Sequence, residues 1–147
     1  MSKIIPRDIP CYCIKFRRAS NILTKYYDKI FEPYNVTANQ FSLLVSISIL
    51  KSCNKSELAQ FARLDRTTIV RSISILLEKD FIEEVLNQNK KFKEIQLTKK
   101  GETVLFEGKE KWQYAQNKVK STIGEENIIT LKQILESIDS LESLLDL

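Results

Sequence analysis

The stretch Asp65-Arg-Thr-Thr-Ile-Val-Arg71 decides the fold that we expect for this chain of 147 residues. Aspartate is a strong helix N-cap, because its carboxylate accepts hydrogen bonds from the free amides of the first turn. Apolar residues then recur at helical spacing. The predicted apolar stripe consists of Ile69, Val70, Ile73, Leu76 and Leu77. The polar residues at the start of the helix, opposite this stripe, are Arg66, Thr67, Thr68 and Arg71.

A shorter helix is predicted immediately before this one. Asn54-Lys-Ser-Glu57 has the form of a capping box, and Leu58, Phe61 and Ala62 would give the helix an apolar side. Only Arg63-Leu-Asp65 separates the two helices, which is the spacing of a helix-turn-helix unit. Helical bundles contain similar pairs, so this signal alone is only moderately specific.

Two β-compatible runs follow the helix pair. Phe81-Ile-Glu-Glu-Val-Leu86 and Phe92-Lys-Glu-Ile-Gln-Leu97 flank the polar linker Asn87-Gln-Asn-Lys-Lys91, which predicts a hairpin with two lysines at its tip. A helix-turn-helix followed by a basic hairpin is the order of a winged helix. We therefore predict a mainly α fold, an α+β winged helix-turn-helix lobe over 37–98, that meets DNA through residues about 65–75 and 88–93.

Helical patterns flank this lobe on both sides. Residues 11–32 predict an amphipathic helix that ends before Pro33, and Thr37-Ala-Asn-Gln40 caps a second helix that is apolar on most sides and should be buried. After the hairpin, Thr98 caps a long helix, and Gly124 separates it from a last helix. The apolar residues of the last helix approximate a heptad seam.

Composition excludes several other functions. Histidine is absent, and the three cysteines form no C-x-x-C pair, so we expect no catalytic residues, no metal and no cofactor. No apolar run is long enough to span a membrane and no secretory signal is evident, which makes the cytoplasm the default location. The net charge is +4, although residues 124–147 hold six acidic residues and one lysine. A basic body favours a polyanionic partner.

The order of elements resembles the MarR family of bacterial transcription regulators. The resemblance is carried by Leu64-Asp-Arg-Thr-Thr-Ile-Val-Arg71, Leu76-Leu-Glu-Lys-Asp-Phe-Ile82 and Leu97-Thr-Lys-Lys-Gly101. It implies a single domain over 1–147, in which helices within 11–35 and 99–147 form a homodimer. Many members carry an Asp-x-Arg motif at the wing; here lysine would have to serve. We therefore expect the wing to anchor the DNA backbone more than to discriminate bases.

The resemblance implies double-stranded DNA with a pseudo-palindromic operator as the partner. Bases or phosphates would be contacted by the start of the second helix and by the wing. The expected DNA-binding residues are Arg66, Thr67, Thr68, Arg71, Ser72, Lys90, Lys91 and Lys93. The alternative is a solvated polar surface, and in that case the chain would be a winged-helix protein–protein adaptor without specific DNA binding.

Control of DNA affinity is expected from one of two sources. The run from Cys13 to Lys25 resembles the peroxide-sensing branch of the family, and the basic side chains nearby would favour a reactive thiolate. Tyr27 falls where that branch has a tyrosine partner, but Arg17 occupies the place of another. Cys11 and Cys13 are therefore candidate redox sensors; the alternative is that they pack inertly at a dimer seam. Cys53 is expected to be a packing residue.

A small aromatic or anionic effector is the second source. Aromatic residues could line a pocket between the dimer helices and the DNA-binding lobe, where family members often bind ligands. The candidate pocket residues are Tyr12, Phe16, Tyr27 and Phe41. Aromatic residues at helical spacing more often form a core, so both interpretations stay open. The regulator is expected to be a repressor.

Overall fold

The computed structural model describes residues 10–87, 89 and 91–145, and it is mainly helical. The first compact unit extends to Lys111 and the second begins at Trp112. Helix α5 (Lys99–Ile123) contributes to both units, and the second also holds α6 (Glu125–Asp139) and a short 3-10 helix (Ser140–Leu144). The expected winged-helix fold class is confirmed. The expectation of one domain over 1–147 stays a prediction.

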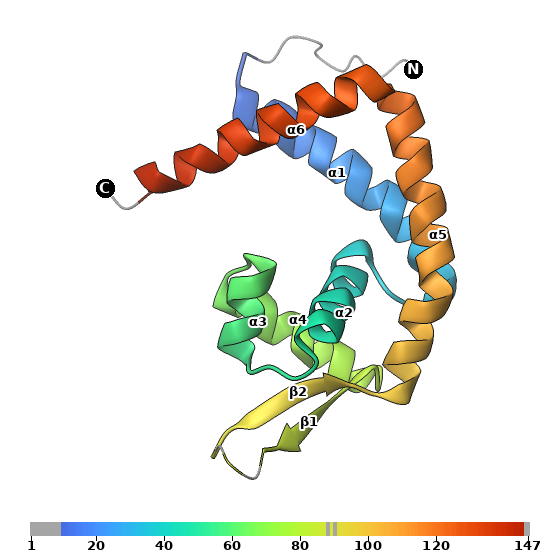
Figure 1. Ribbon diagram of the computed structural model, residues 1–147, viewed down its shortest axis with the longest axis vertical. Helices are drawn as coiled ribbons and strands as arrows, with labels where there is room; N and C mark the ends of the chain where they lie inside the picture. The colour runs from blue at the N-terminus through green and yellow to red at the C-terminus, as the bar shows by residue number, and fades with distance from the viewer. Residues whose placement is uncertain (1–9, 88, 90, 146–147) are drawn as a thin grey trace, which may run out of the picture. The chain divides into compact units, whose positions relative to one another are not determined.

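The first unit starts with α1 (Tyr12–Phe31) and a 3-10 turn (Glu32–Tyr34) that contains Pro33. Helices α2 (Ala38–Leu50), α3 (Lys55–Ala62) and α4 (Arg66–Glu78) follow, and they form a group of three beside the hairpin (Figure 1). The hairpin consists of β1 (Ile82–Leu86) and β2 (Lys93–Leu97), paired antiparallel from Ile82 opposite Leu97 to Leu86 opposite Lys93. No described helix is long and apolar enough to cross a membrane.

Local capping explains where the helices begin. The Thr37 hydroxyl accepts from the Gln40 amide at 3.2 Å, and the Gln40 side chain accepts from the Thr37 amide at 3.2 Å. Asn54 and Glu57 exchange the same two bonds at the start of α3, at 2.8 and 2.9 Å. Both predicted capping boxes are therefore present.

One core joins the elements of the lobe. Its fully buried side chains come from α2, α3, α4 and both strands, and they include Leu44, Ile47, Leu58, Ile69, Ile73, Leu76, Ile82 and Ile95. The expectation that α2 is buried on most sides is wrong for one face, because Val45 and Ile49 are 38% and 62% exposed.

A third chain segment holds the base of the hairpin. The Cys53 amide donates to the Ile95 carbonyl at 3.1 Å, and the Ile95 amide donates to the Cys53 carbonyl at 2.7 Å. The loop between α2 and α3 thereby extends the two-stranded sheet by one bridge. The Cys53 side chain is 1% exposed, in agreement with its expected role in packing.

The Leu97-Thr-Lys-Lys-Gly101 motif connects the hairpin to α5. The Thr98 hydroxyl donates to the Asp80 carbonyl at 2.7 Å and accepts from the Gly101 amide at 3.1 Å. A Cβ atom on Gly101 would overlap the carbonyl oxygen of Phe81, so the close approach of α5 to the turn after α4 needs glycine at this position.

Candidate nucleic-acid interface

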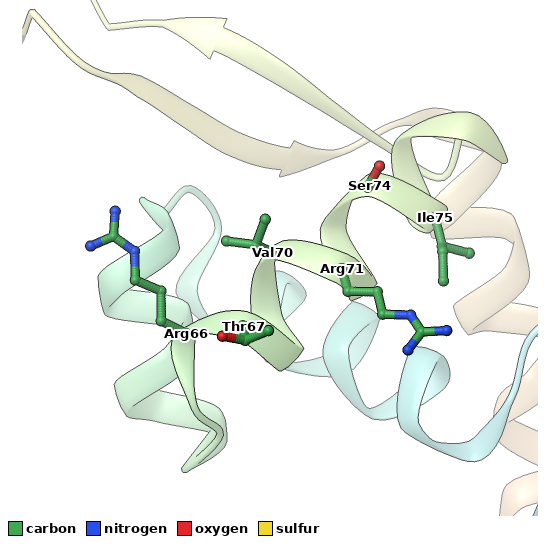
Figure 2. Close-up of a pocket in the computed structure, with 6 residues that line it drawn as sticks. All are labelled: Arg66, Thr67, Val70, Arg71, Ser74 and Ile75. Atoms are coloured by element: carbon green, nitrogen blue, oxygen red, sulfur yellow. The ribbon is translucent and has the colours of Figure 1, made fainter.

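The exposed face of α4 carries most of the candidate site. Arg66, Thr67, Val70, Arg71, Ser74 and Ile75 line an open depression on this face (Figure 2). Figure 2 shows the two arginine side chains diverging on either side of Val70. The opposite face of the helix carries Ile69, Ile73 and Leu76, which are at most 1% exposed. Burial of that stripe determines which side chains α4 presents to solvent.

Asp65 fixes the first turn of α4. Its carboxylate accepts from the Thr68 amide at 2.9 Å and from the Thr68 hydroxyl at 2.7 Å. These two bonds, the backbone one first, hold the pKa of Asp65 below its usual value. The expected N-cap is thus present, but the only hydroxyl proton of Thr68 is already donated. Thr68 in this conformation can accept a hydrogen bond but cannot donate one to a phosphate oxygen.

The structure changes the assignment of two residues on α4. The sequence pattern places Val70 in the apolar stripe, but Val70 is 42% exposed and lies on the same face as Arg71. Ser72 is predicted among the DNA contacts, yet it is half-buried and does not line the depression. A helix advances by about 100° per residue, so a residue adjacent to a buried position can fall on either side of the stripe boundary. Ser74 also lies on the exposed face, and the sequence reasoning missed it.

The C-terminal end of α4 is tied to the corner between α1 and α2. The Lys79 ammonium group donates to the Asn35 carbonyl at 2.8 Å and to the Gln40 side-chain oxygen at 3.0 Å. On the other side of this corner, Asp28 accepts from the Ala38 amide at 2.7 Å. These contacts set the direction of α4 relative to the start of α2.

Two of the three lysines predicted at the wing lie among the described residues. Lys91 is exposed at the hairpin tip. Lys93 begins β2, and its ammonium group lies 3.5 Å from a carboxylate oxygen of Glu84 on the neighbouring strand. Lys90, another predicted contact, lies outside the described residues. Lys91 is therefore the described wing residue best suited to meet a phosphate.

The two candidate redox cysteines lie at the start of α1. Cys11 is the N-cap residue and makes no capping bond with its side chain, and Cys13 is in the first turn. Both thiols are exposed. Among the described residues no cluster of three or more cysteine, aspartate or glutamate residues could hold a metal ion.

The four candidate pocket residues are not brought together within one chain. Phe41 is buried and stacks on Phe31 with ring centroids 4.2 Å apart, and Tyr27 contacts the same ring at 6.4 Å. Tyr12 and Phe16 are 75% and 43% exposed near the start of α1. Phe16 and Tyr27 are 11 residues apart, about 16 Å along a helix. Phe41 is thus a core residue in this structure.

Comparison with known proteins supports the fold. The family model described as MarR family matches residues 36–90. A mutant of MarR from E. coli complexed with operator DNA is similar, with a TM-score of 0.78, 20% identity and coverage of 86% of this chain and 91% of that chain. The regulator MosR from M. tuberculosis in complex with DNA is also similar, with a TM-score of 0.69 and 29% identity. The similarity covers 87% of this chain and 98% of that chain. A search of curated proteins gave no match.

A helix-turn-helix pair with a β wing and an exposed, basic second helix defines a winged-helix transcription regulator of the DNA-binding class. The family model covers most of this lobe, and solved MarR and MosR structures share the fold. The lobe is therefore similar to that of MarR-family regulators. This similarity agrees with the expectation of a regulator rather than an enzyme.

Proposed function

We propose that this chain is a homodimeric repressor that binds a pseudo-palindromic operator in the cytoplasm of a bacterium. The observation that carries the proposal is the exposed face of α4, where Arg66, Thr67 and Arg71 project around one depression from a helix with a capped start. Arginine at the start of a recognition helix is suited to bidentate contact with guanine in the major groove. The similar MarR and MosR structures with DNA support this use of the fold.

The wing has a different role in this proposal. Lys91 is an exposed point charge, which suits a phosphate rather than a base edge. Thr67 and Arg71 are expected to contact bases, while Arg66, Lys90 and Lys91 are expected to contact phosphates. Lys93 could contact a phosphate as well, although Glu84 beside it offsets part of its positive charge.

Exposed apolar side chains support a homodimer. In the first unit, α1 leaves Ile22 and Leu23 70% and 41% exposed. In the second unit, α6 and the turn after it expose Ile129, Ile134, Leu135, Ile138, Leu141, Leu144 and Leu145. Many large apolar side chains exposed on one helix are unfavourable in water and are typical of protein interfaces. Binding to a pseudo-palindromic operator would require the dimer to present its two α4 helices to major grooves about 34 Å apart.

Two control mechanisms remain in the proposal. Exposed Cys11 and Cys13 are accessible to an oxidant, and oxidation at the start of α1 would act on a helix expected in the dimer interface. Alternatively, a small aromatic or anionic effector would use Tyr12, Phe16 and Tyr27 in the dimer. Mass spectrometry after mild peroxide distinguishes them, because unmodified Cys11 and Cys13 at inactivating doses would exclude the thiol mechanism.

Selection of duplexes from a random pool tests DNA recognition. The purified protein is expected to enrich an inverted repeat, with weaker binding at higher salt because neutralised phosphates release counterions. No enrichment would favour the adaptor function instead. For the dimer, Leu135→Gln should yield monomer in sedimentation equilibrium, whereas the neighbouring control Glu136→Gln should stay dimeric. Dimerisation that both variants retain would exclude a role for this face of α6.

A further inference from the structure

We infer that Val70 recognises the C5 methyl group of one thymine in each half-site of the operator. The inference rests on the proposed function, since it assigns a base contact to the same face of α4. Its starting point is the exposure of Val70, which is 42%, although the neighbouring Ile69 is fully buried.

Val70 lies outside the core of the lobe. Leu77, on the same helix, is only partly buried and still packs against the core, so partial exposure alone does not separate a side chain from the core. Among the described residues, Val70 is not one of the side chains packed on that core. Its two methyl groups instead face the depression between Arg66 and Arg71 (Figure 2).

The surroundings of Val70 define what it can recognise. Thr67, Arg71 and Ser74 carry hydrogen-bonding groups on the same face, whereas Val70 and Ile75 offer only apolar contact. Val70 is the one of these two that lies closer to the start of the helix, between Arg66 and Arg71 (Figure 2). In the major groove of unmodified DNA, thymine is the base that presents a methyl group beside its acceptor oxygen. An apolar side chain among polar neighbours on the proposed DNA-binding face therefore matches a thymine edge.

The size of the effect follows from the chemistry of one methyl group. Removing a methyl group from an apolar contact should weaken binding about fourfold. Deoxyuridine differs from thymidine only by this methyl group, so it leaves base pairing and the acceptor oxygen unchanged. Arginine contacts elsewhere in the half-site are not altered by the replacement.

The experiment replaces each thymine of one half-site of the selected operator by deoxyuridine and measures affinity for the full-length protein. The affinity of the wild-type protein should fall about fourfold when the thymine at one position is replaced. Val70→Ala should bind the unmodified operator more weakly and lose this discrimination. Val45→Ala is the matched control, because Val45 is similarly exposed, at 38%, but lies on α2. It should keep the wild-type discrimination.

Three results would overturn the inference. A wild-type protein indifferent to every deoxyuridine replacement shows that no methyl group is recognised. Equal discrimination by wild type and Val70→Ala assigns the methyl contact to another residue. In both cases specific binding of the unmodified operator persists, so the proposed function survives. If no operator can be selected, the inference and the proposed function fail together.

Discussion

Helix α4 and the β1–β2 wing are both exposed, but the structure holds their functional side chains by different means. Two hydrogen bonds from Thr68 to Asp65 fix the first turn of α4. The buried Ile69, Ile73 and Leu76 fix the orientation of the helix about its own axis. The wing is held at its base by Cys53, whereas Lys91 at its tip is exposed. Discrimination between bases needs fixed geometry, while attraction to a phosphate tolerates a range of positions.

Charge separates the two regions as well. The depression on α4 holds two arginines and no acidic residue among its lining residues. On the wing, Lys93 lies beside Glu84, and Glu83 accepts a hydrogen bond from Gln96 at 2.7 Å. Among the described residues, the wing therefore presents less net positive charge than the depression on α4. This difference motivates the proposal that α4 supplies specificity and the wing supplies part of the non-specific affinity.

The largest change in the free energy of unfolding is expected from a substitution in the buried stripe of α4, compared with one near the wing tip. Ile73→Ala should lower the free energy of unfolding by about 2–5 kcal/mol, because it removes buried methyl groups and leaves a cavity. Leu86, which is 69% exposed, is the control, and Leu86→Ala should change the free energy by less than about 0.5 kcal/mol. Urea denaturation at a fixed protein concentration measures both. Equal destabilisation by the two substitutions would contradict a core located under α4.

The free energy of unfolding should depend on alkaline pH through the thiol of Cys53, which lies beside the wing. Burial, followed by the charges of Glu57 and Glu94, raises the pKa of Cys53 to about 11 from 9.0. Between these values the unfolded chain loses the thiol proton and the folded chain keeps it. The contribution of Cys53 to stability is therefore complete below about pH 9 and is lost as the pH rises towards 11.

Comparison with Cys53→Ala isolates this contribution. Over the same window, wild type should lose on the order of 1–3 kcal/mol of unfolding free energy relative to the variant. The free energy is measured by denaturant titration at each pH. Parallel pH profiles would show that Cys53 does not titrate differently in the two states.

The smallest expected effect concerns the cap of α4. Hydrogen bonds from Thr68 hold the pKa of Asp65 below its usual value of 3.8. Its contribution to stability is therefore present above that value and is lost as the pH falls through the lower, folded-state pKa. Asp65→Asn keeps an acceptor that does not titrate in this range. Below about pH 4 the Tm of wild type should therefore fall relative to the Tm of Asp65→Asn. A constant difference would contradict the assigned cap.

The helix starts could be predicted because their signals are local. Asp65 and Thr68 are three residues apart, as are Thr37 and Gln40, and each pair forms within one helical turn. The bridge between Cys53 and Ile95 could not be predicted, since 42 residues separate the partners and neither residue type signals the pairing. Lys93 and Glu84 are only nine residues apart within the predicted hairpin, but their pairing depends on the strand register, which was not predicted.

The site could be predicted only in outline. Arg66, Thr67 and Arg71 lie on the exposed face as expected. Val70 lies outside the predicted buried stripe because the edge of a helical stripe depends on which neighbouring elements cover it, and periodicity alone does not contain that information. Ser72 is half-buried, and its predicted contact with DNA stays a prediction. The stacking of Tyr27 and Phe41 on Phe31 could not be predicted, and the expected pocket beside the dimer helices stays a prediction.

The most direct test of the central claim measures the affinities of Arg71→Ala and Lys91→Ala for the selected operator and a scrambled duplex at two salt concentrations. Arg71→Ala should reduce the preference for the operator by about 1–3 kcal/mol. Lys91→Ala should weaken both duplexes equally and reduce the logarithmic salt slope by about 0.9 for each phosphate that the lysine no longer neutralises. The opposite pattern, with specificity abolished in Lys91→Ala and kept in Arg71→Ala, would contradict the assignment of base recognition to α4.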